Sequence, residues 1–87
     1  MEFQKEPGRI YAERDGRLVA EITFPTEGGT AVITHTFVDD SLRGQGVAAQ
    51  LVHAAAEQIR AEGKQARPVC SYAQKWFAQH PEASDLL

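Results

Sequence analysis

The sequence has a single cysteine, Cys70, in a chain of 87 residues, so no disulfide can form within it. Long apolar runs are also missing, and none approaches the roughly 20 residues that a membrane-spanning helix needs. The N-terminal stretch MEFQKEPGR lacks the apolar core of a secretory signal. The sequence therefore predicts a protein of the reducing cytoplasm, with no membrane partner.

Basic residues are in the minority. Nine Lys and Arg stand against twelve Asp and Glu, and the resulting net charge of −3 argues against nucleic acid as the main partner. No group of Cys, His, Asp and Glu has the spacing of metal ligands, so no metal site is predicted. With 43% hydrophobic and 24% charged residues and no internal repeat, residues 1–87 are expected to form one small domain.

Residues 9–24 are patterned as a β-hairpin. Asp15-Gly16 at the centre is typical of a type I′ turn, in which both central residues have positive φ. After the turn, residues alternate with a period of two, which predicts a buried face of Leu18, Ala20, Ile22 and Phe24 opposite Arg17, Val19, Glu21 and Thr23. Residues 25–29 have the composition of a loop, and the β-branched run 30–38 predicts a third strand in an antiparallel meander.

The pattern changes period after Gly46. Apolar residues then recur at helical spacing and predict a helix that ends before Gly63, with the stripe Ala48, Leu51, Val52, Ala55 and Ile59. Residues 64–69 suit a short strand and residues 70–80 a second helix. The predicted order is β-β-β-α-β-α, an α/β fold with a mixed sheet, in which the strand–helix–strand unit over 30–69 makes one parallel pair.

The stretch RGQGVA, residues 43–48, stands at the entrance of the first predicted helix. A helix N-terminus presents unpaired backbone N–H groups, and glycines allow a phosphate to approach the backbone closely. The residues therefore predict an anion site formed by Arg43, Gly44, Gln45, Gly46, Val47 and Ala48. The alternative is that the glycines only redirect the chain from strand to helix.

Two well-known phosphate motifs do not explain this loop. The P-loop needs Gly-Lys-Ser/Thr at the helix start, which is absent. The spacing Gly44-x-Gly46-x-x-Ala49 meets a loose dinucleotide fingerprint, but that fold also needs an acid at the end of the next strand. Here the strand ends in Pro68-Val69-Cys70, so we exclude a dinucleotide site.

A third motif fits. Arg-x-x-Gly-x-Ala at 43–48 resembles the acetyl-CoA loop of the GNAT superfamily of N-acetyltransferases. In chain order, a Thr-x-Val strand end, the Arg-Gly-x-Gly loop, Pro-x-Cys at 68–70 and His-Pro-Glu at 80–82 are similar to the small, stand-alone GNAT-like proteins. The resemblance covers essentially the whole chain and is densest from residue 34 to residue 87.

The resemblance implies a minimal GNAT-like fold with acetyl-CoA as the cofactor. It implies that the loop amides hold the pyrophosphate, that the preceding strand splays from its parallel neighbour, and that backbone N–H around Phe37 and Val38 polarises the thioester carbonyl. The implied activity is transfer of acetyl to an amine of a small molecule or a protein. Because only residues 1–29 precede the central strand, the acceptor half of a full-length GNAT enzyme is nearly missing. The alternatives are a non-catalytic coenzyme A-binding module or subunit, and a small structural domain whose glycine loop is only a turn.

Three side chains are candidates for acid–base chemistry. Cys70, at the end of the predicted parallel strand and the start of the last helix, is placed to receive the acyl group, to protonate the coenzyme A thiolate, or to pack as a small hydrophobe. His35 suits a general base for an ammonium acceptor, although alternation with Ile33 and Phe37 also allows a hydrogen-bonded core histidine. Tyr72 is a candidate because many GNAT enzymes use a tyrosine of the final helix as the thiol acid.

Overall fold

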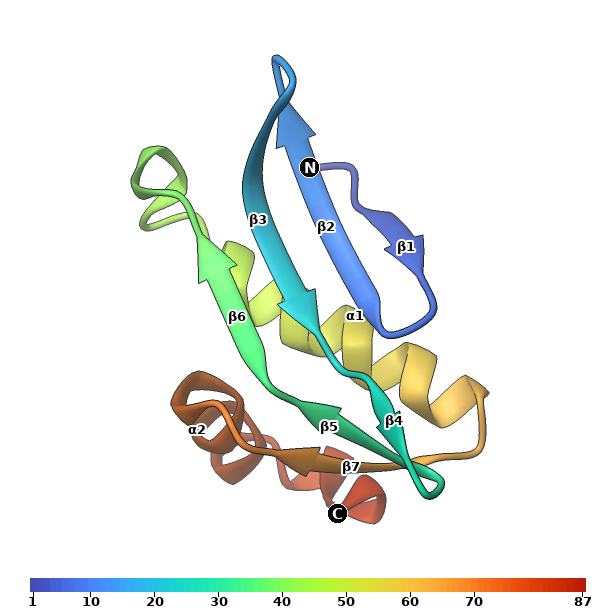
Figure 1. The fold of residues 1–87 in the computed structure, drawn as a ribbon. Coiled ribbons are helices and arrows are strands. Elements are labelled where there is room, and N and C mark those ends of the chain that lie inside the picture. The colour runs from blue at the N-terminus through green and yellow to red at the C-terminus, as the bar shows by residue number, and fades with distance from the viewer.

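The computed structural model describes residues 1–87 and shows a mixed α/β arrangement of two sheets against two helices (Figure 1). The elements in chain order are β1 (Gln4–Glu6), β2 (Arg9–Arg14), β3 (Arg17–Thr23), β4 (Thr26–Glu27), β5 (Thr30–Ile33), β6 (His35–Val38), the 3₁₀ helix η1 (Asp40–Leu42), α1 (Val47–Ala61), β7 (Gln65–Pro68), α2 (Ser71–Gln79) and the 3₁₀ helix η2 (Pro81–Leu86). Neither α-helix has the length and apolar character that crossing a membrane requires.

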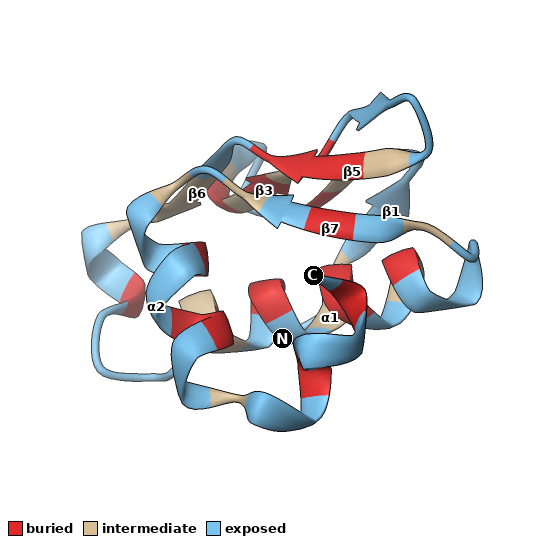
Figure 2. Cartoon of the chain, turned by 90° about the horizontal axis from the view of Figure 1, so that it is seen from below, coloured by how far each residue is buried: buried red, intermediate tan, exposed pale blue.

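Four antiparallel strands in the order β1-β2-β3-β6 make the larger sheet. The predicted hairpin is confirmed, with Asp15 and Gly16 at φ values of 54° and 76° in its turn. Helix α1 lies behind this sheet in Figure 1, and Figure 2 shows both helices on one side of the strands, with buried residues gathered between the layers. The opposite face of the larger sheet carries no helix.

A β-bulge corrects the predicted alternation in the hairpin. Ala12 pairs with Ala20, but the next pair is Glu13 with Leu18, so Val19 is an extra residue on β3. As a result Val19 and Ala20 are both buried, and Leu18 is only half-buried. The prediction that Leu18 belongs to the buried face and Val19 to the other face was wrong, because one inserted residue exchanges the two faces.

The predicted strand over 30–38 breaks at Thr34 into two strands that join different sheets. Strand β5 pairs in parallel with β7, as the strand–helix–strand unit predicted, while β6 pairs with β3. The Thr34 N–H donates to the Thr23 carbonyl at 3.0 Å, which fixes the break. Ile33 is fully buried, yet the side chain of His35 is 53% exposed, so the alternative of a core histidine was wrong.

Helix α1 packs most of its predicted apolar stripe against the larger sheet, although Ala48 is only half-buried. The buried residues are Val47, Leu51, Val52, Ala55, Ala56 and Ile59. The helix ends as predicted before Gly63, whose φ is 69°, and the chain then crosses to β7. Arg60 on α1 holds η2 through a two-pronged pair with Asp85 at 3.0 and 3.3 Å, and these hydrogen bonds lower the pKa of Asp85 below its ordinary value.

Candidate active site

The loop that enters α1 leaves a continuous run of backbone N–H groups free. The N–H of Arg43 donates to the Asp40 carbonyl, but every N–H from Gly44 to Ala49 has no acceptor in the chain. Gly46 is the N-cap residue and offers no side-chain cap, whereas most helices use Ser, Thr, Asp or Asn there. The start of α1 is therefore an unfilled set of donors at the positive end of a helix dipole.

Both loop glycines are required by backbone conformation. Gly44 has a φ of 79° and Gly46 a φ of 70°, in the left-handed region that other residues rarely adopt. A Cβ atom added at either position meets nothing within 4 Å, so internal packing does not explain the glycines. The missing side chains leave open space beside the loop backbone.

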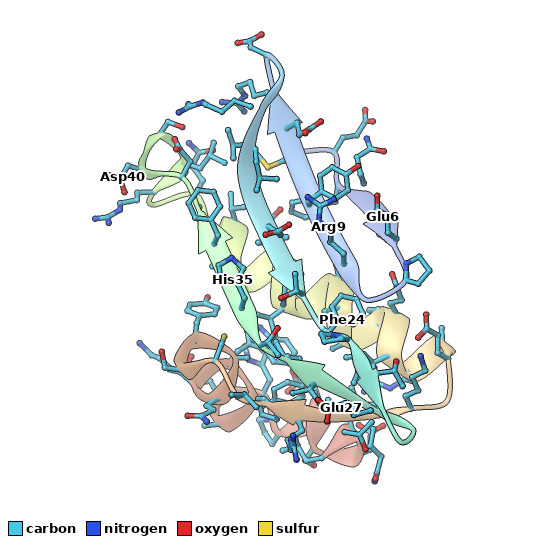
Figure 3. The ribbon with its side chains drawn as sticks, viewed as in Figure 1. Glu6, Arg9, Phe24, Glu27, His35 and Asp40 are labelled. Carbon is cyan, nitrogen blue, oxygen red and sulfur yellow. The ribbon has the colours of Figure 1, made fainter.

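Arg43 lies at the exposed rim of the loop. Its guanidinium pairs with Asp40 at 3.0 Å, and its side chain is 80% exposed. Figure 3 shows Asp40 at the tip of the loop, pointing into solvent. An exposed pair of this kind contributes little to stability, so exchange of Asp40 for an anionic ligand costs little.

The free edge of β6 continues from this loop toward the point where the sheets separate. Asp39 N–H donates to the Val19 carbonyl, and the antiparallel ladder alternates from there along β6. The alternation turns the N–H of Phe37 toward β3, and turns the N–H groups of Thr36 and Val38 toward the unpaired edge. This edge offers backbone donors and acceptors to an extended ligand.

Cys70 follows the C-terminal end of β7, at the point where β6 leaves the β5–β7 pair. The N–H groups of Val69 and Cys70 both donate to the Ile33 carbonyl, which is the last link between β7 and β5. The Cys70 sulfur is the N-cap of α2, accepting from the Ala73 N–H at 3.3 Å, and it lies 3.3 Å from Thr36 Oγ1. The half-buried thiol therefore faces the space between β6 and α2. Thr36 begins the Thr-x-Val strand end, but nothing in the sequence indicated a role for it in the site.

The other two candidate acid–base residues lie elsewhere around this space. His35 projects from the face of the sheet that α1 does not cover (Figure 3). The side chain of the next residue, Thr36, points to the opposite face, where it contacts Cys70. Tyr72, in the first turn of α2, is partly exposed and its hydroxyl makes no hydrogen bond. The structure thus places Cys70 and His35 on opposite faces of β6 rather than in contact.

A hollow of about 460 Å³ lies between α1 and α2. Its lining residues are Phe3, Ala49, Gln50, His53, Ala54, Trp76 and His80. The Trp76 ring, only 5% exposed as a residue, stacks on His80 with ring centres 4.1 Å apart. Ala49 and Gln50, in the first turn of α1, belong to this lining, so the hollow begins near the N-terminus of the helix.

Comparisons with known proteins agree with this geometry. A family model described as GCN5-related N-acetyl-transferase matches residues 9–86. A GCN5-like protein from Staphylococcus aureus, solved by NMR, is 28% identical with a TM-score of 0.79, over 98% of this chain and 85% of that chain. Among curated proteins, no sequence matches.

Two further solved structures share the fold at lower identity. A GNAT family acetyltransferase from Brucella melitensis in complex with acetyl-CoA is 21% identical with a TM-score of 0.62, over 78% of this chain and 50% of that chain. N-acetylglutamate synthase from Neisseria gonorrhoeae, complexed with coenzyme A and N-acetyl-glutamate, is 18% identical with a TM-score of 0.67, over 84% of this chain and 18% of that chain. This chain therefore spans half or less of these two proteins.

Proposed function

Because the chain belongs to the GCN5-related N-acetyltransferase family, we propose that it binds acetyl-CoA at the loop before α1 and transfers the acetyl group to an amine. The observation that carries the proposal is the continuous run of free N–H groups from Gly44 to Ala49, followed by the unpaired edge of β6. Such a run at a helix N-terminus suits a pyrophosphate, and an open strand edge suits the amide-containing pantetheine arm.

Each part of the cofactor has a matching surface. The pyrophosphate would accept hydrogen bonds from the amides of Gly44 to Ala49, with Arg43 exchanging Asp40 for a phosphate oxygen. The pantetheine amides would pair with the backbone of Thr36 and Val38. The nucleotide end would then lie toward the hollow between α1 and α2, whose lining includes Phe3, Ala49 and His80.

Acetyl transfer needs three contributions from the chain. The N–H of Val38, directed to the open edge, would stabilise negative charge on the thioester oxygen as the amine nitrogen attacks the carbonyl carbon. His35, on the uncovered face, would take the proton from the amine. As the carbon–sulfur bond breaks, Cys70 would give its proton to the coenzyme A thiolate, and Tyr72 is the alternative donor. The Phe37 N–H is directed toward β3, so it would not contact the thioester oxygen.

A second candidate function is a coenzyme A-binding module without transferase activity. The observation that favours it is the bare face of the larger sheet, where no further element forms an acceptor pocket (Figure 2). If the acceptor is itself a folded protein, its own surface would complete the acceptor pocket. A transferase for protein amines would then acetylate such a protein, whereas a simple binding module would only bind coenzyme A.

The binding step predicts a large thermal shift. At a concentration of acetyl-CoA one hundred times its dissociation constant, stability should rise by about 2.7 kcal/mol. For a domain of this size we expect a rise in Tm of about 10–20 °C, measured by calorimetry with NAD as the control ligand. The single tryptophan gives an independent readout, because Trp76 lines the hollow beside the loop. If acetyl-CoA gives no more shift than NAD, the proposed function is wrong.

Substitutions at Cys70 separate its structural role from its chemical role. Cys70→Ala removes the acceptor for the Ala73 N–H and should cost about 1 kcal/mol, the usual loss for an N-cap. Cys70→Ser keeps an N-cap acceptor and should keep the native Tm. If the thiol donates the proton to the leaving group, Cys70→Ser should nevertheless lose about a hundredfold in kcat, measured by thiol release from acetyl-CoA. Full activity of Cys70→Ser would assign the proton to another donor.

A further inference from the structure

The bare face of the larger sheet carries a linked set of charged side chains next to β6. The strand register places Arg9, Thr23 and His35 in one cross-strand row, and places Glu21 diagonally between Arg9 and His35. Figure 3 shows Glu6, Arg9 and His35 along this front face. The Glu21 carboxylate uses both oxygens, with Oε2 at 2.6 Å from Arg9 Nε and Oε1 at 3.6 Å from His35 Nε2.

Glu21 is held more firmly than a surface carboxylate usually is. Its side chain is only 17% exposed, and Arg9 contacts it from β2 while also lying 3.6 Å from Glu6 and 3.8 Å above the Tyr11 ring. The hydrogen bond to Glu21 raises the pKa of Arg9. Because Arg9 is fixed on three sides, it fixes the orientation of the Glu21 carboxylate toward His35.

This arrangement places Nε2 of His35 beside the Glu21 carboxylate. With Nε2 directed at Glu21, the second ring nitrogen, Nδ1, is left for an outside partner. His35 precedes Thr36, whose backbone N–H faces the open edge, so an amine that approaches from the bare face passes the imidazole. When the ring accepts a proton from that amine, the new positive charge lies beside the Glu21 carboxylate.

We propose that Glu21 is a positioning residue for acetyl transfer, which orients His35 and stabilises the imidazolium formed when His35 accepts the proton of the acceptor amine. Arg9 positions Glu21 in turn. The inference rests on the proposed function, and it identifies the bare sheet face as the side from which the acceptor enters. The charged groups connected to His35 across this face are Glu21 on β3, Arg9 on β2 and Glu6 at the end of β1.

The test is Glu21→Gln, which keeps the size of the side chain and removes its charge. We expect kcat for acetyl transfer to fall at least about tenfold, while KM for acetyl-CoA stays within about a factor of two, because a base acts in the chemical step. The matched control is Glu13→Gln, at an exposed carboxylate of β2 that makes no ion pair.

A double-substitution cycle with His35→Gln shows whether Glu21 acts through His35. In the His35→Gln background, Glu21→Gln should have no further effect on kcat. If kcat falls equally in both backgrounds, or if the wild type transfers acetyl and Glu21→Gln leaves kcat unchanged, the positioning role is overturned and the proposed function stands. If the wild type binds acetyl-CoA but acetylates no amine, acetyl transfer and the role of Glu21 are both overturned.

Discussion

Gly46→Val should weaken acetyl-CoA binding by about a hundredfold, which corresponds to the loss of two charge-assisted hydrogen bonds of about 1.5 kcal/mol each. Gly46 holds a φ of 70° as the N-cap of α1, and a β-branched residue is strained there. The loop is expected to relax to negative φ, which turns the N–H groups of Gly46 and its neighbours away from the pyrophosphate. Titration calorimetry, or the fluorescence of Trp76, measures the dissociation constant.

The matched control for this prediction is Gly63→Val. Gly63 has nearly the same φ, 69°, and an added Cβ atom again meets nothing within 4 Å. It lies at the C-terminal end of α1, about 25 Å from Gly46 at 1.5 Å per helical residue. Gly63→Val should therefore lower Tm as much as Gly46→Val does and leave the dissociation constant unchanged. An equal loss of affinity in both variants would mean that the effect is general destabilisation.

Local patterns were sufficient to predict the elements that surround the site. The turn residues Asp15 and Gly16, the helical stripe of α1 and the final Gly63 each depend on a few neighbouring positions. The loop over 43–48 was found in the same way, because glycines before a helical stripe are unusual and follow a recognisable order. The family and the fold class therefore followed from the sequence.

The geometry of the site was harder to predict from the sequence, because it depends on which strands pair. The run 30–38 has uniform β propensity, and nothing in it marks Thr34 as the residue where one strand leaves β7 and joins β3. That break exposes His35, opens the edge of β6 and brings Thr36 to Cys70. The approach of Glu21 to His35 follows from the register between β3 and β6, which is also a long-range property.

Val38→Pro should reduce kcat by about 10²- to 10³-fold, the usual effect of removing one donor to a developing oxyanion. The Val38 N–H faces the open edge, so proline there removes no hydrogen bond of the β3–β6 ladder. The preceding residue, Phe37, is already extended in β6, as a residue before proline must be. The folded state should therefore survive, and steady-state kinetics of thiol release will show a loss in the chemical step.

Three companion variants define what that loss means. Val38→Ala keeps the N–H and should keep kcat near the wild-type value, which separates the backbone from the side chain. Phe37→Pro removes a donor that faces β3 and should lower Tm sharply, whereas Val38→Pro should not. Thr36→Pro tests the other amide on the open edge. A native Tm with full kcat in Val38→Pro, together with a large loss of kcat in Thr36→Pro, would move the oxyanion donor to Thr36 and bring the thioester closer to Cys70, which already contacts that residue.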